Sequence, residues 1–287
     1  MDPTAADVGV ALTAEGGELF DLFRRPQGRS RARPDERTVI ESARTGELRV
    51  NGQAVGTYGW GDGRRPVLLV HGWESRASRY AKLIAALVER GCSPVSFDAP
   101  GHGESGGDST TLLEYQAIIA ELHGEHGEFA AVVGHSFGAL AAFLSMRGGV
   151  RAHRVVAVSP VPDFSYLFDT FCVAMKLSPE LEREVRFRIE RDLYPDVRDM
   201  WDRFSVLDGI EASPAPLLIV QDENDETVDP ERAAGLAGAV GDRARLFTTR
   251  RFGHRRILGA PQVVAEIAAF VAATQVRTGA DTEVMAG

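Results

Sequence analysis

The 287-residue sequence predicts an α/β fold, in which a mostly parallel central sheet has helices on both faces and one helical cap insertion. Continuously apolar segments of strand length alternate with amphipathic helical segments, which is typical of parallel strands buried on both faces. The alternation stops between residues 161 and 213, where helical stretches follow one another without a strand-like segment. These two observations define a sheet domain with an insertion.

The elements follow in order along the chain. Residues 1–45 form a lead-in that we expect to be partly ordered, with a short helix in GGELFDLF and a solvated Arg/Pro-rich loop after it. The pair Asn51-Gly52 between β-type residues predicts a tight hairpin at one edge of the sheet. Strands are then expected at 66–72, 93–99, 130–136, 155–160, 216–222 and 244–249, and helices at 78–90, 111–125, 138–147, 230–240 and 261–274.

The domain boundaries follow from this order. The core comprises residues 46–160 and 214–276, the cap comprises 161–213, and 277–287 form a C-terminal tail. Within the cap, Ser178 before Pro179 predicts the start of a helix. Leu181, Val185, Ile189 and Leu193 repeat every four residues and give this helix one apolar stripe.

Composition limits the function classes. The net charge of −9 argues against nucleic acid as the main partner. Cys92 and Cys172 lack metal-ligand spacing and are expected to be buried apolar residues, and no other metal-ligand set is evident. The chain lacks an apolar run of about 20 residues and a signal-peptide pattern. We therefore expect a cytoplasmic protein without a membrane partner, a metal or another cofactor; the oligomeric state stays open.

The segment GHSFG at 134–138 matches G-x-S-x-G between a predicted strand and a predicted helix. Such a turn is too sharp for bulky neighbours, and Gly134 and Gly138 relieve the crowding. Ser136 would then project above the sheet at a helix N-terminus as a nucleophile. A plain turn with a solvent-exposed serine is the alternative when the motif is taken alone.

A nucleophilic serine needs a base and a carboxylate. His254 follows the last predicted strand and is the candidate base. Among the nearby acids, Asp222 lies close to the strand end and Asp229 precedes the helix at Pro230, so Asp225 is the candidate carboxylate. The backbone N–H groups of Trp73 and Phe137 are the candidate oxyanion donors.

Other residues have roles that are expected to be mainly structural. His71 and His102 should brace the loops of the cleft, and His135 should pack or bond locally. The histidines of HGEHGE should be surface residues, and a solvated or structural role is favoured for Arg255 and Arg256 over binding of an acidic substrate group. In the cap, inward-facing aromatic side chains would form an apolar pocket, and the candidates for substrate binding are Phe164, Phe168 and Phe171.

The segments VHGW, FDAPGHGES, GHSFG, DENDETV and GHRRIL, in this order, resemble the α/β-hydrolase superfamily over roughly residues 47–275. The resemblance implies a triad of Ser136, Asp225 and His254, an oxyanion hole at Trp73 and Phe137, and a variable cap. One departure concerns the acid loop: many relatives have a proline directly after its valine, and here Asp229 stands between Val228 and Pro230.

The resemblance implies a serine hydrolase that acts on a small-molecule carboxylic ester, or a thioester, of a small to medium acyl group. An acyltransferase or a hydrolase of carbon–carbon bonds would retain the same triad. A non-catalytic binding protein of the same fold is the alternative from a different class. The serine at position 136 excludes relatives that use an aspartate nucleophile.

Overall fold

The computed structural model describes residues 10–208, 210 and 214–273. The predicted C-terminal tail lies outside the described residues, as do 1–9 of the lead-in and 209 and 211–213 of the cap.

The described residues contain one sheet of eight strands in the order β1-β2-β4-β3-β5-β6-β7-β8. The strands are β1 (Arg44–Val50), β2 (Gln53–Gly59), β3 (Pro66–Val70), β4 (Ser93–Phe97), β5 (Ala131–His135), β6 (Val155–Val158), β7 (Leu217–Asp222) and β8 (Ala244–Thr249). β1 pairs with β2 and β2 with β4 antiparallel, and the remaining pairs are parallel. The predicted hairpin is confirmed, because Asn51 and Gly52, with φ of 49° and 78°, connect the paired residues Val50 and Gln53.

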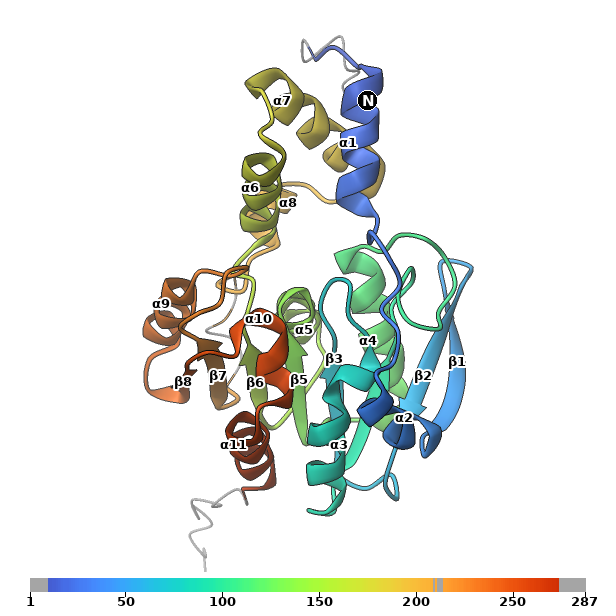
Figure 1. Ribbon diagram of the computed structural model, residues 1–287, viewed down its shortest axis with the longest axis vertical. Coiled ribbons are helices and arrows are strands. Elements are labelled where there is room, and N and C mark those ends of the chain that lie inside the picture. Colours follow the sequence, from blue (N-terminus) through green and yellow to red (C-terminus); the bar gives the residue numbers. More distant parts are fainter. Residues whose placement is uncertain (1–9, 209, 211–213, 274–287) are drawn as a thin grey trace, which may run out of the picture.

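Helices cover both faces of the sheet (Figure 1). One face carries α3 (Ala81–Val88) and α11 (Pro261–Ala272), with α2 (Pro34–Glu41) beside α3, and the other carries α4 (Leu112–His126), α5 (Phe137–Arg147) and α9 (Pro230–Val240). Successive strand residues point to opposite faces, so Leu68 packs in one apolar cluster while Leu69 packs in the other. The mostly parallel α/β fold predicted from the sequence is therefore confirmed.

The insertion between β6 and β7 lies beyond the carboxyl ends of the strands (Figure 1). It contains α6 (Phe164–Met175), α7 (Pro179–Arg188), a π-helical turn at Ile189–Leu193, and α8 (Met200–Arg203). α7 begins where the sequence predicts, with the Ser178 hydroxyl accepting a hydrogen bond from the N–H of Leu181. The chain leaves and re-enters the core at neighbouring points, since the Phe164 N–H donates to the Phe204 carbonyl at 2.8 Å.

The lead-in contains the predicted short helix, α1 (Ala14–Arg24). α1 packs against helix α7 of the insertion (Figure 1). The Arg/Pro-rich stretch was expected to be a solvated loop, but its last residues, from Pro34, begin α2, and Glu36 there is buried. The part before Pro34 is a loop that is only partly solvated. The guanidinium of Arg29 donates to the carbonyl oxygens of Gly103 and Gly107 at 3.3 and 2.5 Å. The lead-in is thus attached both to the cap and to the core.

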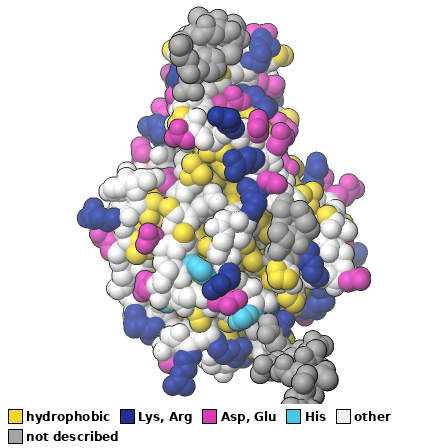
Figure 2. All heavy atoms as spheres, turned by 180° about the vertical axis from the view of Figure 1, so that it is seen from behind, with side chains coloured by type: hydrophobic (Ala, Val, Ile, Leu, Met, Phe, Trp, Pro, Cys, Tyr) yellow, Lys and Arg dark blue, Asp and Glu magenta, His cyan; other side chains and the backbone are white. Residues whose placement is uncertain are grey.

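On the side opposite to the view of Figure 1, acidic and basic side chains are interspersed rather than gathered in one basic patch (Figure 2). Within the described part of the chain, no helix combines the length and the apolar character needed to cross a bilayer.

Candidate active site

The turn between β5 and α5 holds Ser136 in an unusual backbone conformation, with φ of 54° and ψ of −122°. The flanking glycines permit this turn because other backbone comes very close to them. A Cβ at Gly134 would lie 2.5 Å from the Ala139 Cα, and one at Gly138 would lie 2.4 Å from the carbonyl oxygens of Val70 and His71. The strained serine is therefore pressed against β3, at the carboxyl edge of the sheet.

Three polar side chains meet at this edge. The Nε2 atom of His254 lies 3.0 Å from the Oγ of Ser136, and its Nδ1 atom lies 2.9 Å from the Oδ2 of Asp225. His254 comes from the short helix α10 (Gly253–Arg256) after β8, and Asp225 from the loop after β7. The structure thus brings together the serine, histidine and aspartate selected from the sequence.

The Asp225 carboxylate is held by several donors besides the imidazole. Its Oδ1 accepts hydrogen bonds from the N–H groups of Thr227 and Val228 at 2.9 and 3.0 Å, and Gln221 donates to Oδ2 at 3.2 Å. Burial alone would raise the pKa of this carboxyl, but the hydrogen bond and charge of His254 and the two N–H groups lower it to about 2. An ionised carboxylate at Nδ1 keeps the proton there and leaves Nε2 as an acceptor facing Ser136.

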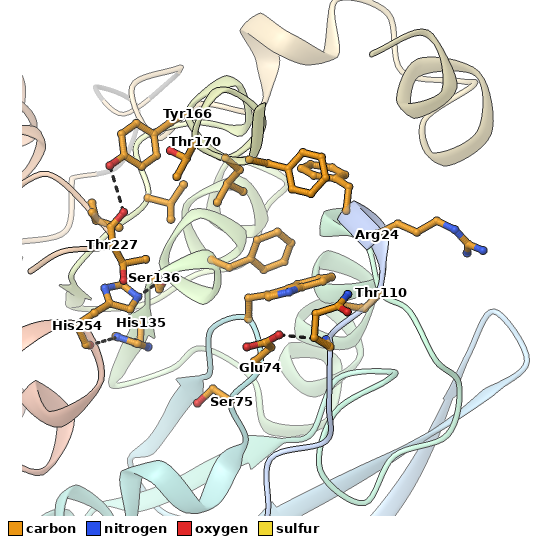
Figure 3. Close-up of a pocket in the computed structure, with 18 of the residues that line it drawn as sticks. Arg24, Glu74, Ser75, Thr110, His135, Ser136, Tyr166, Thr170, Thr227 and His254 are labelled. Carbon is orange, nitrogen blue, oxygen red and sulfur yellow. Dashed lines mark hydrogen bonds between the residues drawn. The ribbon is translucent and has the colours of Figure 1, made fainter. Parts of the chain in front are cut away.

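A cavity of about 490 Å³ opens above Ser136 and His254. The cap supplies much of its wall, including Phe164, Leu167, Phe171 and Met175. Figure 3 shows Ser136 and His254 on one side of the cavity and Arg24, at the end of α1, on the other.

A family model described as "Alpha/beta hydrolase family" matches residues 67–267 of this chain. The chain belongs to the alpha/beta hydrolase family. No match was found among curated proteins.

Solved structures agree with this assignment. A putative lipase from Acinetobacter baumannii is 17% identical, with a TM-score of 0.61, and the match covers 91% of this chain and 97% of that one. Naproxen esterase (carboxylesterase NP) from Bacillus subtilis is 14% identical, with a TM-score of 0.61 and coverages of 91% and 99%. A monoacylglycerol lipase from Paleococcus ferrophilus is 26% identical, with a TM-score of 0.55 and coverages of 76% and 98%. At 17% and 14% identity, the lipase from Acinetobacter baumannii and naproxen esterase share the fold of this chain.

In this alpha/beta hydrolase, the two candidate oxyanion donors belong to neighbouring segments. A Cβ at Gly72, the residue before Trp73, would lie 3.0 Å from the Ser136 Cβ, and the rings of Trp73 and Phe137 are 5.7 Å apart. Phe137 is the first residue of α5, where backbone N–H groups have no acceptor within the helix. Phe137 follows Ser136 directly, and Trp73 follows Gly72, whose backbone lies against the Ser136 side chain.

Two buried histidines brace the loops beside the site, as expected from the sequence. The Nε2 atom of His71 accepts from the Ala99 N–H at 3.0 Å, and that of His102 accepts from the Glu74 N–H at 3.0 Å. Burial lowers the pKa of both imidazoles, to about 3 for His102. Both rings are therefore neutral at physiological pH and join the loops after β3 and β4.

His135 supports His254 from within the elbow. Its Nε2–H donates to the His254 carbonyl oxygen at 2.9 Å, and the two rings are 4.8 Å apart. Burial, with a smaller contribution from the neighbouring His254, lowers the pKa of His135 to about 3. The imidazole of His135 therefore stays neutral, and its hydrogen bond to the His254 carbonyl helps to position His254.

The structure also places the remaining residues selected from the sequence. Arg255 lines the cavity and pairs with Glu74 at 3.1 Å. His123 accepts from the Arg151 N–H, and no three metal-ligating side chains group together among the described residues. Of the three cap aromatics expected at the substrate, Phe164 and Phe171 line the cavity and Phe168 does not. Phe168 is 4% exposed and packs between Trp201 and Phe23.

Asp222 has a structural part in the site that the sequence did not reveal. Its buried carboxylate accepts from the Thr249 hydroxyl at 2.8 Å and from the N–H groups of Asn224, Phe252 and Gly253 at 3.0, 3.1 and 3.0 Å. These bonds fix the loop that ends in His254. Asp222 lies at the end of β7, which was the reason for not choosing it as the partner of His254. From the same position its carboxylate can reach the loop after β8.

We expect Asp222→Asn to lower the free energy of unfolding by about 2–3 kcal/mol near neutral pH, because charge-assisted hydrogen bonds are lost. Burial would raise the pKa of Asp222, but the donors, led by the Gly253 N–H, lower it below its usual 3.8. The stabilisation is then complete above pH 3.8 and is lost as the pH falls through the lowered pKa. In urea unfolding, the difference in the free energy of unfolding between the wild type and Asp222→Asn should become smaller below about pH 4.

The neighbouring Glu223→Gln is the matched control. Glu223 pairs with Arg250 at the surface, where both side chains are largely exposed. Its substitution should change the free energy of unfolding by less than about 0.5 kcal/mol. Equal effects of the two substitutions at neutral pH would contradict the role given to Asp222.

Proposed function

We propose that this protein is a serine hydrolase that cleaves a carboxylic ester, or a thioester, of a small to medium acyl group through an acyl-enzyme on Ser136. The observation that carries the proposal is the continuous hydrogen-bonded path from Asp225 through His254 to Ser136, at the base of a largely apolar cavity. The esterases and lipases among the solved structures of similar fold support the same reaction class.

The first half of the reaction forms the acyl-enzyme. His254 Nε2 takes the proton of the Ser136 hydroxyl as Oγ forms a bond to the acyl carbonyl carbon. Asp225, which accepts from Nδ1–H, stabilises the charged imidazolium. The carbon–oxygen or carbon–sulfur bond to the leaving group then breaks, and the leaving alcohol or thiol takes the proton from Nε2.

The second half repeats these steps with water. His254 takes a proton from water as the water oxygen attacks the acyl carbon, and Ser136 leaves with that proton when the acid is released. In both halves the negative oxygen of the tetrahedral intermediate accepts hydrogen bonds from the N–H groups of Trp73 and Phe137. The proposed reaction uses only these groups and water.

The cavity supports an apolar acyl group as the substrate portion. Its volume, about 490 Å³, lies in the usual range for a small-molecule site. Phe164, Leu167 and Phe171 supply apolar wall, and the Tyr166 hydroxyl donates to the Thr227 carbonyl at 3.2 Å, which joins the cap to the loop of Asp225 (Figure 3).

The test is labelling by a fluorophosphonate, which reacts covalently with activated serines. The wild-type protein should be labelled once per chain, and Ser136→Ala should not be labelled. Ser145→Ala, in α5 and outside the cavity lining, should be labelled like the wild type. Failure of the folded wild type to react would contradict the proposal and favour a non-catalytic binding protein.

Product analysis then separates hydrolysis from acyl transfer, which would use the same triad. With p-nitrophenyl esters, a hydrolase releases the free acid whether or not an added alcohol or thiol is present. Transfer of the acyl group to such an acceptor as the main product would instead indicate an acyltransferase.

A further inference from the structure

One wall of the cavity comes from the N-terminal segment, residues 13–33, which precedes the part of the chain matched by the family model. Leu22, Phe23, Arg24 and Arg25 line the cavity from the end of α1. The substrate-facing surface of this protein therefore includes residues that are remote in sequence from both the core and the cap.

The first end of this segment is fixed to the cap. The backbone N–H and the hydroxyl of Thr13 both donate to the carboxylate of Glu184 on α7, each at 2.7 Å. Glu184 is 2% exposed and also accepts from Arg188. A Cβ at Gly16 would lie 2.1 Å from the Glu184 carboxyl carbon, so only glycine permits this close approach.

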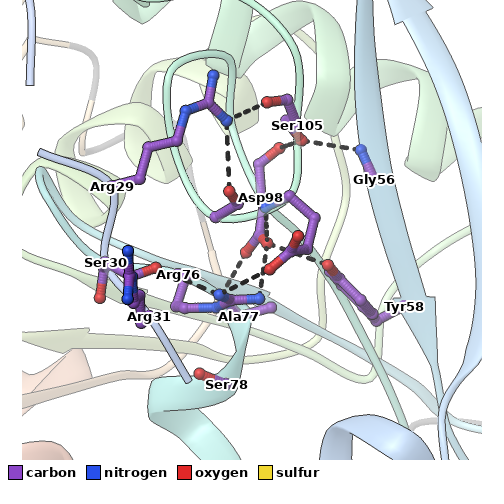
Figure 4. Close-up of polar contacts among 12 residues, drawn as sticks. Arg29, Ser30, Arg31, Gly56, Tyr58, Arg76, Ala77, Ser78, Asp98 and Ser105 are labelled. Atoms are coloured by element: carbon purple, nitrogen blue, oxygen red, sulfur yellow. Dashed lines mark hydrogen bonds and ion pairs between the residues drawn. The ribbon is translucent and has the colours of Figure 1, made fainter. Parts of the chain in front are cut away.

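The second end is fixed to the core. The Gln27 N–H donates to Glu74 at 3.0 Å, and Arg76 donates to the Ser30 carbonyl at 3.2 Å. Figure 4 shows Arg29 reaching the loop that carries Ser105, and Arg76 between Ser30 and Asp98. Phe23 lies between these two attachments, so its position relative to the cavity is set from both sides.

Phe23 packs at the centre of the aromatic face of α6. Its ring lies 5.8, 6.0 and 5.2 Å from the rings of Phe164, Phe168 and Phe171, each in an edge-on arrangement. Phe23 lines the cavity, and Phe168, which does not line it, packs against the Phe23 ring. The adjacent Arg24 lies on the side of the cavity away from His254 (Figure 3).

We propose that Phe23 is a specificity-determining residue that limits the length of the acyl chain, because its ring lines the cavity next to Arg24, which lies on the side away from Ser136 and His254. This inference rests on the proposed function, in which the acyl carbonyl is held at Ser136. Removing the ring opens space toward Phe168 and lets a longer chain enter, whereas a larger ring shortens the site.

The experiment measures labelling rates with alkyl fluorophosphonates from butyl to dodecyl. Phe23→Ala should move the preferred chain to greater length, with a gain of up to about fourfold for each methylene that becomes buried. Phe23→Trp should move the preferred chain to shorter length. A general loss of structure would not shift the preferred chain length in opposite directions in the two variants, whereas a change in the cavity wall at Phe23 would.

Phe20→Ala is the matched control. Phe20 belongs to the same helix and is 8% exposed, but it packs in the core and is not part of the cavity lining. Its substitution loosens α1 to a similar degree and should leave the order of chain-length preference unchanged.

The outcomes distinguish this inference from the proposed function. Labelling of the wild type with an unchanged chain-length preference in both Phe23 variants would overturn the inference and leave the serine hydrolase intact. A shift in Phe20→Ala equal to that in Phe23→Ala would also overturn it. A wild type that is labelled by no member of the series would overturn both.

Discussion

Replacement of Asp225 by asparagine is expected to lower kcat/KM for ester hydrolysis about ten-thousandfold and to leave the protein folded. The amide of Asp225→Asn presents an N–H to His254, so the imidazole places its proton on Nε2, facing Ser136. In that tautomer Nε2 cannot accept the serine proton. Steady-state kinetics with p-nitrophenyl esters measure the loss, and thermal unfolding verifies that the variant is folded.

Asp229→Asn provides the matched comparison in the same loop. The Asp229 side chain accepts from the Glu231 N–H at 3.0 Å and begins α9, without lining the cavity. We expect kcat/KM to change by less than about threefold, because an asparagine can also cap a helix. A larger loss from Asp229→Asn than from Asp225→Asn would reverse the assignment of the acid and would give weight to the shifted proline at Pro230.

A second large effect is expected from Gly138→Ala, which should destabilise the protein by about 3–5 kcal/mol or prevent folding. The added methyl group would lie 2.4 Å from two carbonyl oxygens at the end of β3. Backbone at the centre of a sheet cannot move aside as a flexible side chain can. Urea unfolding, with the midpoint and slope fitted together, measures the change.

Gly235→Ala is the control for this substitution. Gly235 lies inside α9 with no other atom within 4 Å of the position of an added Cβ. The same methyl group should stabilise the protein there by about 0.5–1 kcal/mol, since alanine favours the helix interior. A Gly138→Ala protein as stable as the wild type would show that the elbow does not press against β3.

Much of the fold was predictable because its signals are local. β3 is apolar throughout and β5 is apolar up to His135, and Asn51-Gly52 fits a turn with positive φ at both positions. The meeting of Ser136, Asp225 and His254 was predictable for a related reason. Parallel strands end at the same edge of a sheet, so loops that follow them lie close together even when they are far apart in sequence.

The cap interior and the lead-in were harder to predict because their contacts are remote. The apolar pattern of α6 places Phe164, Phe168 and Phe171 on one face, but it does not tell which ring another segment will cover. Phe23, which packs against Phe168, lies 145 residues before it in the sequence. Asp222 was hidden for the same reason, since three of its four hydrogen-bond donors (Thr249, Phe252 and Gly253) lie about 30 residues further along the chain, at or after the end of β8.

The neighbouring exit and entry points of the insertion affect how proteins of this architecture can diversify. The Phe164–Phe204 and Val206–Pro162 hydrogen bonds, each 2.8 Å, close the insertion at its base. Lengthening a loop closed in this way costs only about 0.6 kcal/mol for each doubling. The register of β6 and β7 does not depend on what lies above that base.

The length of the insertion can therefore change at little cost to the sheet, provided that a contact like that of Tyr166 with the loop of Asp225 is kept. In this protein the insertion is also attached to the N-terminal helix α1. Glu184 on α7 holds Thr13, and Gly16 fits against the same carboxylate, so a new insertion needs a compatible N-terminal helix. Substitutions at Glu184 and at Thr13 should accordingly be non-additive in their effects on the free energy of unfolding.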